Sequence, residues 1–349
     1  MLQDHKNRIV RAKGENNIET VIEVLLSLRV NALQISPELR RNLITELIRN
    51  DIFFVKQNGN FKFLSELLQI EQAGLKHAVC AMMSVVASTV HGVEYLLVSE
   101  ARPDFEAVTR VVDILYKSAE CTDGSVTQRF CLAILQKMSC KEEVVELLNK
   151  LGLQTWLIDL LEKSTKIKGS KQPTVSQPIH VFCLDFASAL LANILHSYAV
   201  LEALEKNQSL LKDIMTRLLN LLKEAIPTSV LIHVLICLSY LSKERFNQVL
   251  EECLFVERIS DFVEWYSIKN PIFDATNPEG SHGKNATANA IVDKKTVLDL
   301  CAHMFHPKES SHDVSGTMEY NELKQEEKIK EFENVQGDLI FECFQDEVS

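Results

Sequence analysis

A unit of three predicted helices recurs along this chain and limits the folds open to it. Residues 143–163, EVVELLNKLGLQTWLIDLLEK, contain a short helical pattern, a break at Gly152 and a second helical pattern. The apolar residues of the second pattern share one face of an amphipathic helix: Leu153, Trp156, Leu157, Leu160 and Leu161. A mostly apolar helix, SVTQRFCLAILQKMSC, lies just upstream. We therefore predict a unit of short, amphipathic and buried helix, with Gly152 at the corner between the first two.

The unit recurs at intervals typical of helical repeat proteins. With Val86, Lys137, Asn193 and Tyr240 as equivalent positions in successive third helices, the intervals are 51, 56 and 47 residues. The longest interval contains a basic insertion rich in Pro, Ser and Gly at residues 164–178. Without it, the period falls to about forty residues, which favours stacked helical repeats.

The third helix of one unit is apolar on almost every side. In residues 181–196, VFCLDFASALLANILH, twelve of sixteen residues are apolar, so we expect neighbouring helices to cover this helix. Asp185 within it is expected to bond to an adjacent helix, because a buried carboxylate without a partner is costly. Trp156 and Trp265 lie on apolar faces of second helices, where we expect both to pack in the core.

Two stretches carry a resemblance to a known family. VELLNKLGLQTWLIDLLEKS resembles the junction between the first and second helices of armadillo repeats, and ASALLANILHS resembles the end of their third helix. The resemblance implies an all-α, armadillo/HEAT-like right-handed helical solenoid. More narrowly, the run resembles the armadillo region of the LisH-domain armadillo-repeat proteins of cilia and basal bodies. The LisH motif and coiled coil of that family are not visible in this sequence, so the resemblance implies a fragment or a short isoform and carries over no LisH dimerisation.

The chain divides into five predicted segments. We expect an N-terminal arm at 1–17, armadillo-like repeats at 18–266 and a flexible loop at 267–293, where Asn, Pro and Gly gather. A helix at 294–306 is expected to cap the open end of the stack. Residues 307–349 are expected to form a disordered acidic tail.

Charge and composition narrow the classes of partner. The net charge is −11, and residues 306–349 hold twelve Asp and Glu against four Lys, which places −8 there. The rest has no dense Lys/Arg stripe, so nucleic acid is not expected as a partner. No apolar run is long enough to span a bilayer, and the nine cysteines form no CxxC pair. We therefore expect no membrane insertion and a cytoplasmic protein.

No catalytic or cofactor motif is complete. EGSHGKN at 279–285 suggests a phosphate loop, but Pro278 and Asn285 stand where that motif needs Gly and Ser or Thr. GxGxxG, HExxH and GxSxG patterns are absent from the sequence. We expect no enzyme activity and no cofactor.

One cluster has residue types that bind metals. It consists of Cys301, His303, His306 and His312. No second Cys lies nearby to complete a tetrahedral site, so we expect partly exposed histidines at a helix end and no metal.

The third helices supply the candidate binding residues: Val86, Lys137, Asn193 and Tyr240. Armadillo proteins of the importin and catenin types use an Asn in successive third helices to hold an extended peptide, and the context LLANILHS of Asn193 matches. The other three positions break the series, so the resemblance does not imply a continuous Asn ladder. The alternative is that Asn193 bonds to a local neighbour.

These features together predict a non-catalytic scaffold that binds proteins along its concave helical surface. On the narrower resemblance, the partners are ciliary or basal-body components, the location is the basal body or centriole, and the role is support of cilium assembly or signalling. The alternative is an importin-like adaptor that recognises linear peptide signals.

Overall fold

The computed structural model describes residues 2–55, 62–97, 105–119, 125–167, 181–224, 226–269, 295–302 and 304. Within these ranges the regular structure is helical, without a strand, which confirms the predicted all-α class. The chain divides into two compact units, the first ending at Val144 and the second beginning at Val145.

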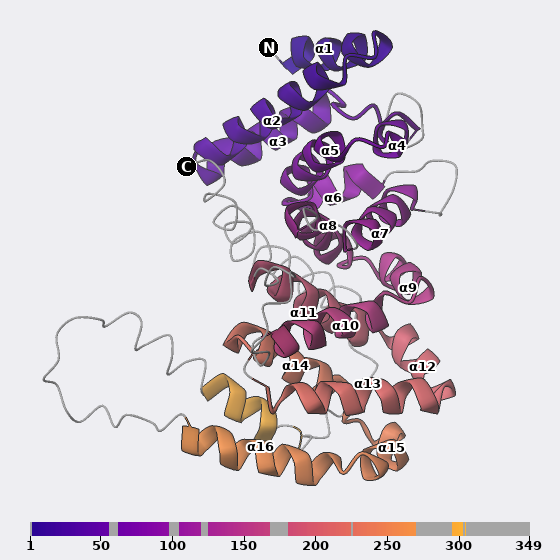
Figure 1. Cartoon of the computed structure of the whole chain (residues 1–349), viewed down its shortest axis with the longest axis vertical. Helices are drawn as coiled ribbons and strands as arrows, with labels where there is room; N and C mark the ends of the chain where they lie inside the picture. The colour runs from indigo at the N-terminus through magenta and orange to yellow at the C-terminus, as the bar shows by residue number, and fades with distance from the viewer. Residues whose placement is uncertain are drawn as a thin grey trace, which may run out of the picture. The chain divides into compact units, whose positions relative to one another are not determined.

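Eight helices belong to the first unit (Figure 1). They are α1 (Leu2–Gly14), α2 (Ile18–Gln34), α3 (Pro37–Arg49), α4 (Lys62–Gln69), α5 (Ala73–Val86), α6 (Val90–Leu97), α7 (Glu106–Ala119) and α8 (Ser125–Met138). Helix α5 packs against both α2 and α8, and every residue from Ala78 to Val86 is buried. Helix α7 packs along α8 and also contacts α4, and α3 contacts α6.

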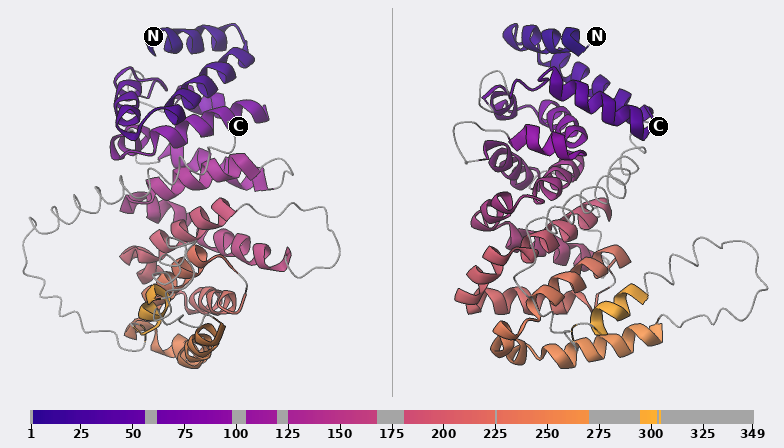
Figure 2. Two further views of the ribbon diagram at one scale, coloured as in Figure 1. Left: turned by 90° about the vertical axis from the view of Figure 1, so that its left-hand side faces the viewer. Right: turned by 180° about the vertical axis from the view of Figure 1, so that it is seen from behind.

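The second unit repeats the same order of helices. It comprises α9 (Glu142–Lys150), which begins just before the division, α10 (Leu153–Ile167), α11 (Val181–His196), α12 (Tyr198–Lys206), α13 (Gln208–Leu221), α14 (Thr228–Leu241), the 3-10 turn η1 (Glu244–Phe246), α15 (Asn247–Glu252) and α16 (Phe255–Lys269). Helix α11 packs along α14, and α10 packs along α13. Residues 295–302 form a further helix that lies beside α16 in each view (Figure 2).

The helix order reproduces the predicted triplets. A short, an amphipathic and a buried helix follow one another in α6–α7–α8, α9–α10–α11 and α12–α13–α14, and α15–α16 begin a fifth set. In the first set, α3–α4–α5, the first helix has 13 residues and the second has 8. The buried members are the most apolar because they contact neighbours on several sides; the buried residues of α11 extend around most of the helix, whereas those of α14 lie on one side of it.

Local signals place the helix boundaries where the sequence predicts them. Gly152 has φ +73° between α9 and α10, a left-handed conformation that favours glycine. Ser36 accepts a hydrogen bond from the backbone N–H of Leu39, and Asn207 accepts one from Leu210 at 3.2 Å, so both cap the helices that follow. Pro227 precedes α14 at the capping position.

Several predicted segments lie partly or wholly outside the described residues. These are the insertion from residue 168 to 178, the loop from 270 to 293 and the acidic tail at 307–349. Helix α16 continues to Lys269, three residues past the predicted end of the repeats at 266. The predicted N-terminal arm contains α1, whose Ile9 and Ala12 are buried.

None of the described helices is by itself both long and apolar enough to cross a membrane. Helices α11 and α12 pass such a test on length and composition only as a pair, bent by 77° at the break between them.

Candidate functional site

The polar seam is a line of hydrogen-bonding side chains on the two most apolar helices of the second unit, α11 and α14. We define it by four residues of α11 and three of α14: Asp185, Ser188, Asn193, His196, Ser229, His233 and Tyr240. Because α11 and α14 pack side by side, residues spaced three and four apart on each helix can meet across the contact.

The first half of the polar seam is a closed hydrogen-bond network. Ser229 Oγ donates to Asp185 Oδ1, which confirms the predicted bond from Asp185 to a neighbouring helix. Ser188 Oγ lies 2.9 Å from His233 Nδ1. Burial lowers the pKa of His233, although the nearby Asp185 carboxylate acts in the opposite direction. This half therefore joins α11 to α14 around a neutral imidazole.

The same network contains the residue types of a hydrolytic triad, but not its arrangement. Ser188 is 1% exposed, so its hydroxyl cannot meet a substrate in this conformation. Asp185 precedes Ser188 by one turn of the same helix and is engaged by Ser229. The network therefore has the geometry of a structural cross-link between helices.

The second half of the polar seam is open to solvent. His196 is exposed at the end of α11, and its ring meets the half-buried ring of Tyr240 edge to face at 4.9 Å. Asn193 lies one turn before His196 and is also half-buried. Burial raises the pKa of Tyr240, which keeps its phenol neutral. An amide, an imidazole and a phenol thus offer both donors and acceptors, which the backbone of an extended peptide requires.

The other two predicted binding residues lie in the first unit, where both are buried. Val86 is 0% exposed at the end of α5, and Lys137 is 1% exposed near the end of α8. Their side chains are not offered to a partner in this conformation. The helical period predicts that all four residues occupy equivalent positions in the repeats. It does not predict which neighbouring helices bury each side chain.

The cationic face is a cluster in the first unit that the sequence reasoning did not single out. We define it as Arg29 of α2, His77 of α5, and Arg129, Phe130 and Lys137 of α8. The guanidinium carbon of Arg29 lies 5.0 Å from the centre of the Phe130 ring, and the His77 ring lies 5.2 Å from it. Desolvation by burial lowers the pKa of Lys137 to about 7. The sequence contains one sign of this cluster, since α5 and α8 have no Asp or Glu.

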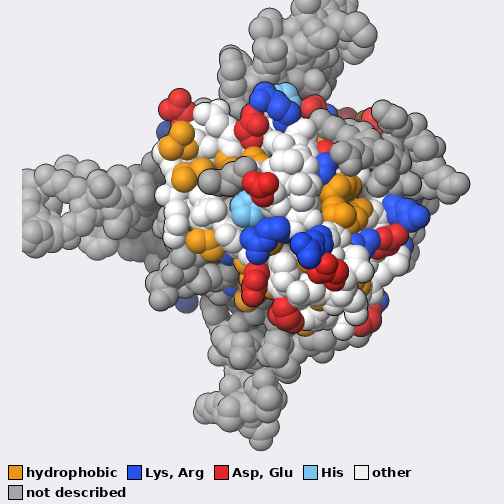
Figure 3. Space-filling model, turned by 90° about the horizontal axis from the view of Figure 1, so that it is seen from above, with side chains coloured by type: hydrophobic (Ala, Val, Ile, Leu, Met, Phe, Trp, Pro, Cys, Tyr) orange, Lys and Arg blue, Asp and Glu red, His pale blue; other side chains and the backbone are white. Residues whose placement is uncertain are grey.

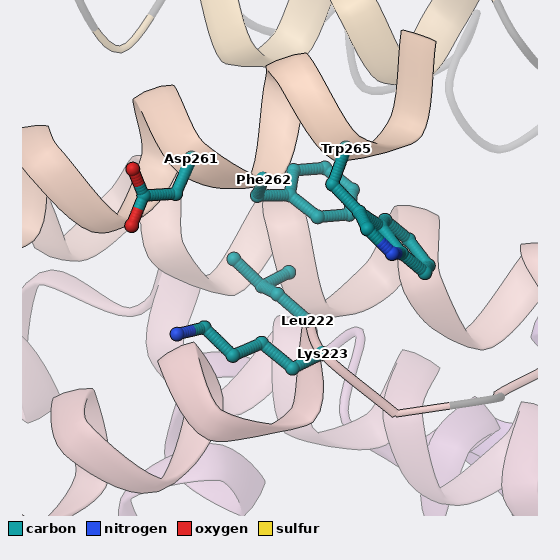
Figure 4. A pocket seen from close by; sticks show the side chains of 5 residues that line it. All are labelled: Leu222, Lys223, Asp261, Phe262 and Trp265. Atoms are coloured by element: carbon teal, nitrogen blue, oxygen red, sulfur yellow. The ribbon is translucent and has the colours of Figure 1, made fainter. Parts of the chain in front are cut away.

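A small cavity lies beside α16 in the second unit (Figure 4). Its volume is about 280 Å³, and its lining consists of Leu222, Lys223, Asp261, Phe262 and Trp265. That volume suits a single side chain better than a small-molecule ligand, for which sites of roughly 300–1,000 Å³ are usual.

The predicted burial of one tryptophan is wrong. Trp265 is 40% exposed, whereas Trp156 is half-buried. Helix α16 is followed among the described residues by the short helix at 295–302, which leaves Trp265 exposed.

The predicted metal-like cluster is only partly described. Cys301 is buried, while His303, His306 and His312 lie outside the described residues. Within the described part of the chain, no three His, Cys, Asp or Glu side chains come together as a metal site would require.

The end of the first unit that carries α1 shows no dominant charge (Figure 3). On the part of this face that described residues form, Lys and Arg side chains are interspersed with Asp and Glu. Such mixing differs from the continuous basic surface typical of nucleic-acid binding.

Comparison with known proteins identifies the class of fold. A designed armadillo repeat protein matches with a TM-score of 0.52 and 14% identity, covering 85% of this chain and 100% of that protein. A designed armadillo repeat protein in complex with the peptide (KR)4 matches with a TM-score of 0.54 and 13% identity, covering 86% of this chain and 99% of that one. Armadillo repeat proteins computationally designed for modular peptide recognition also match, with a TM-score of 0.54, 14% identity, and coverage of 86% of this chain and 99% of theirs.

These likenesses confirm the predicted armadillo-like α-solenoid fold. No protein-family model matches the sequence, and no curated protein sequence is significantly similar to it.

Proposed function

We propose that this protein is a non-catalytic scaffold that binds an extended segment of another protein along its third helices. The observation that carries the proposal is the open half of the polar seam, where Asn193, His196 and Tyr240 gather on adjacent third helices. Side-chain amides can hold both the N–H and the C=O of a peptide backbone, and aromatic rings can pack on its side chains. The designed armadillo repeat protein in complex with the peptide (KR)4 provides a precedent for peptide binding on this fold.

The test is a selection of extended peptides from a random library on the immobilised full chain. Peptides that bind should lose affinity at least about tenfold with Asn193→Ala or Tyr240→Ala, because each substitution removes a polar or aromatic contact worth about 1.4 kcal/mol. Asn247→Ala, at an exposed position on α15, is the matched control and should bind as the unmodified chain does. Unchanged affinity in both variants would rule out the polar seam as the binding surface.

We further propose that the bound protein is a component of the cilium or basal body, where the scaffold supports cilium assembly or signalling from the cytoplasmic side. The support is the resemblance of the sequence to the LisH-domain armadillo-repeat family. Proximity labelling in ciliated cells tests this location, with basal-body proteins expected among the labelled partners. Labelling dominated by nuclear-transport cargo would instead favour the importin-like adaptor, although the isolated Asn193 speaks against that alternative.

A further inference from the structure

Two chain junctions lie side by side at the open end of the polar seam. One leads from α11 into α12, and the other leads from α14 into η1. His196 of the first junction meets Tyr240 of the second edge to face at 4.9 Å. Two residues after His196, the Tyr198 ring lies 5.5 Å from the guanidinium carbon of Arg245. The side chains that follow the third helices therefore continue the surface on which we propose that a peptide lies.

The basic flank of the polar seam consists of Tyr198, Lys243 and Arg245. Tyr198 is 71% exposed, and Lys243 is exposed as well. Within the described part of the chain, the Lys243 ammonium has no hydrogen-bond or ion-pair partner. Among the same residues Arg245 Nε has no acceptor, and the guanidinium meets Glu205 at 3.8 Å, the long end of an ion pair. The flank thus holds an exposed ammonium and a guanidinium that is only partly neutralised.

The two cations of the basic flank are close enough to repel each other. Partial burial and, to a smaller extent, the charge of Arg245 lower the pKa of Lys243. Of the other carboxylates on the adjoining elements, Glu202 is bonded to Lys206 at 2.7 Å, and Glu244 is exposed next to Lys243 in the chain. A further carboxylate near both cations would be attracted by each of them and would offset their repulsion.

The basic flank can be reached from solvent. The side chain of Arg245 is 21% exposed, and a guanidinium can hold a carboxylate through two parallel N–H···O bonds. The exposed Tyr198 supplies a hydroxyl donor and an apolar ring face beside it. These groups match an acidic side chain in both charge and shape.

We propose that the peptide held by the polar seam carries an Asp or Glu whose carboxylate binds Lys243 and Arg245. The proposal rests on the proposed function and names the class of peptide that the same surface takes. The peptide backbone lies against Asn193 and Tyr240, and the acidic residue follows at a fixed distance along the peptide. A basic residue at that position is disfavoured, because it places like charges next to each other.

Selection of random peptides on the immobilised full chain, followed by sequencing of the bound peptides, tests the proposal. Bound peptides should be enriched in Asp or Glu at one position, and replacing that residue by Asn or Gln should weaken binding about tenfold. Lys243→Met should weaken the acidic peptide about tenfold and leave the neutral peptide unchanged, because the two changes remove the same contact. Lys150→Met with Lys163→Met is the matched control, since it removes two exposed cations of the same unit and should have no effect.

Two results would overturn the proposal: bound peptides without an acidic preference, or an equal loss of acidic and neutral peptides in Lys243→Met. If the chain's own acidic residues occupied the basic flank, the full chain would show no acidic preference, and the proposal would fail in that way too.

Arg245→Met should act as Lys243→Met does, once a melting curve shows that this variant is folded. If it is not folded, Lys243→Met decides, because Lys243 is exposed. Binding that depends on Asn193 and Tyr240 but not on Lys243 would refute this inference alone. Binding that depends on none of the three would refute the proposed function as well.

Discussion

At the scale of single residues, a few buried polar groups determine how the helices are joined. The Tyr95 hydroxyl donates to Asp51 Oδ1 at 2.7 Å and accepts the backbone N–H of Phe53 at 3.0 Å. Asp51 and Phe54 have positive φ values of 48° and 58°, so this connection after α3 is held in a conformation that non-glycine residues rarely adopt. Tyr95 therefore fixes a strained turn to α6. Local sequence patterns do not reveal this contact, because 44 residues separate the two partners.

Tyr95→Phe should destabilise the first unit by about 1–3 kcal/mol, since the substitution leaves buried hydrogen-bonding groups without the hydroxyl. Urea denaturation measures the loss. Tyr198→Phe is the control, because Tyr198 is exposed and should show no comparable change. Equal stability of the Tyr95 variant and the unmodified chain would contradict the role assigned to the hydroxyl.

His233 should make the second unit sensitive to acid. Burial lowers its pKa in the folded state, so below about 6.5, the usual value, the unfolded chain binds more protons than the folded one. Stability is therefore fully present above that pH and is lost as the pH falls through it towards the folded pKa. Between pH 7.5 and pH 5, urea midpoints should fall further in the unmodified chain than in His233→Gln, whereas the exposed His91→Gln should behave as the unmodified chain does. Identical pH dependence in the His233 variant would refute this account.

At the scale of helices, the periodicity of apolar residues predicts where a helix forms. It does not predict which helices pack against it. The triplets, the corner at Gly152 and the caps at Ser36 and Asn207 follow from local spacing and local hydrogen bonds, so the sequence contains them. The burial of Lys137 and the exposure of Trp265 depend on which helices stack on each face. Local patterns carry no such information.

Gly92 illustrates a constraint that only the packing reveals. A Cβ placed on Gly92 of α6 would lie 1.7 Å from the Val86 carbonyl oxygen at the end of α5. Gly92→Ala should therefore force α6 away from α5 and destabilise the first unit by more than about 2 kcal/mol. Gly74→Ala is the matched control within α5, where the nearest atom would be 3.5 Å away and helix propensity favours Ala. Denaturation midpoints that rank the two variants equally would contradict this packing.

At the scale of the whole molecule, the repeat order explains why the third helices are the natural binding surface. The first and second helices pack against one another within and between triplets. For example, Arg217 of α13 forms ion pairs with Asp159 and Glu162 of α10. The third helices of the second unit carry half-buried or exposed polar side chains at Asn193, His196 and Tyr240. Of the four binding residues proposed from sequence, the open half of the polar seam contains the two in the second unit. The cationic face emerges only when side chains of α2 and α8 are seen together.

The most direct test of the central claim is a map of where a bound peptide touches the full chain. A library-selected peptide carrying a photoreactive phenylalanine analogue is cross-linked to the protein, and mass spectrometry locates the attachment sites. Attachment is expected on α11 and α14 around Asn193, His196 and Tyr240, and should be lost with excess unlabelled peptide. Attachment confined to α10, α13 or α16 would show that the peptide binds the second helices instead of the third.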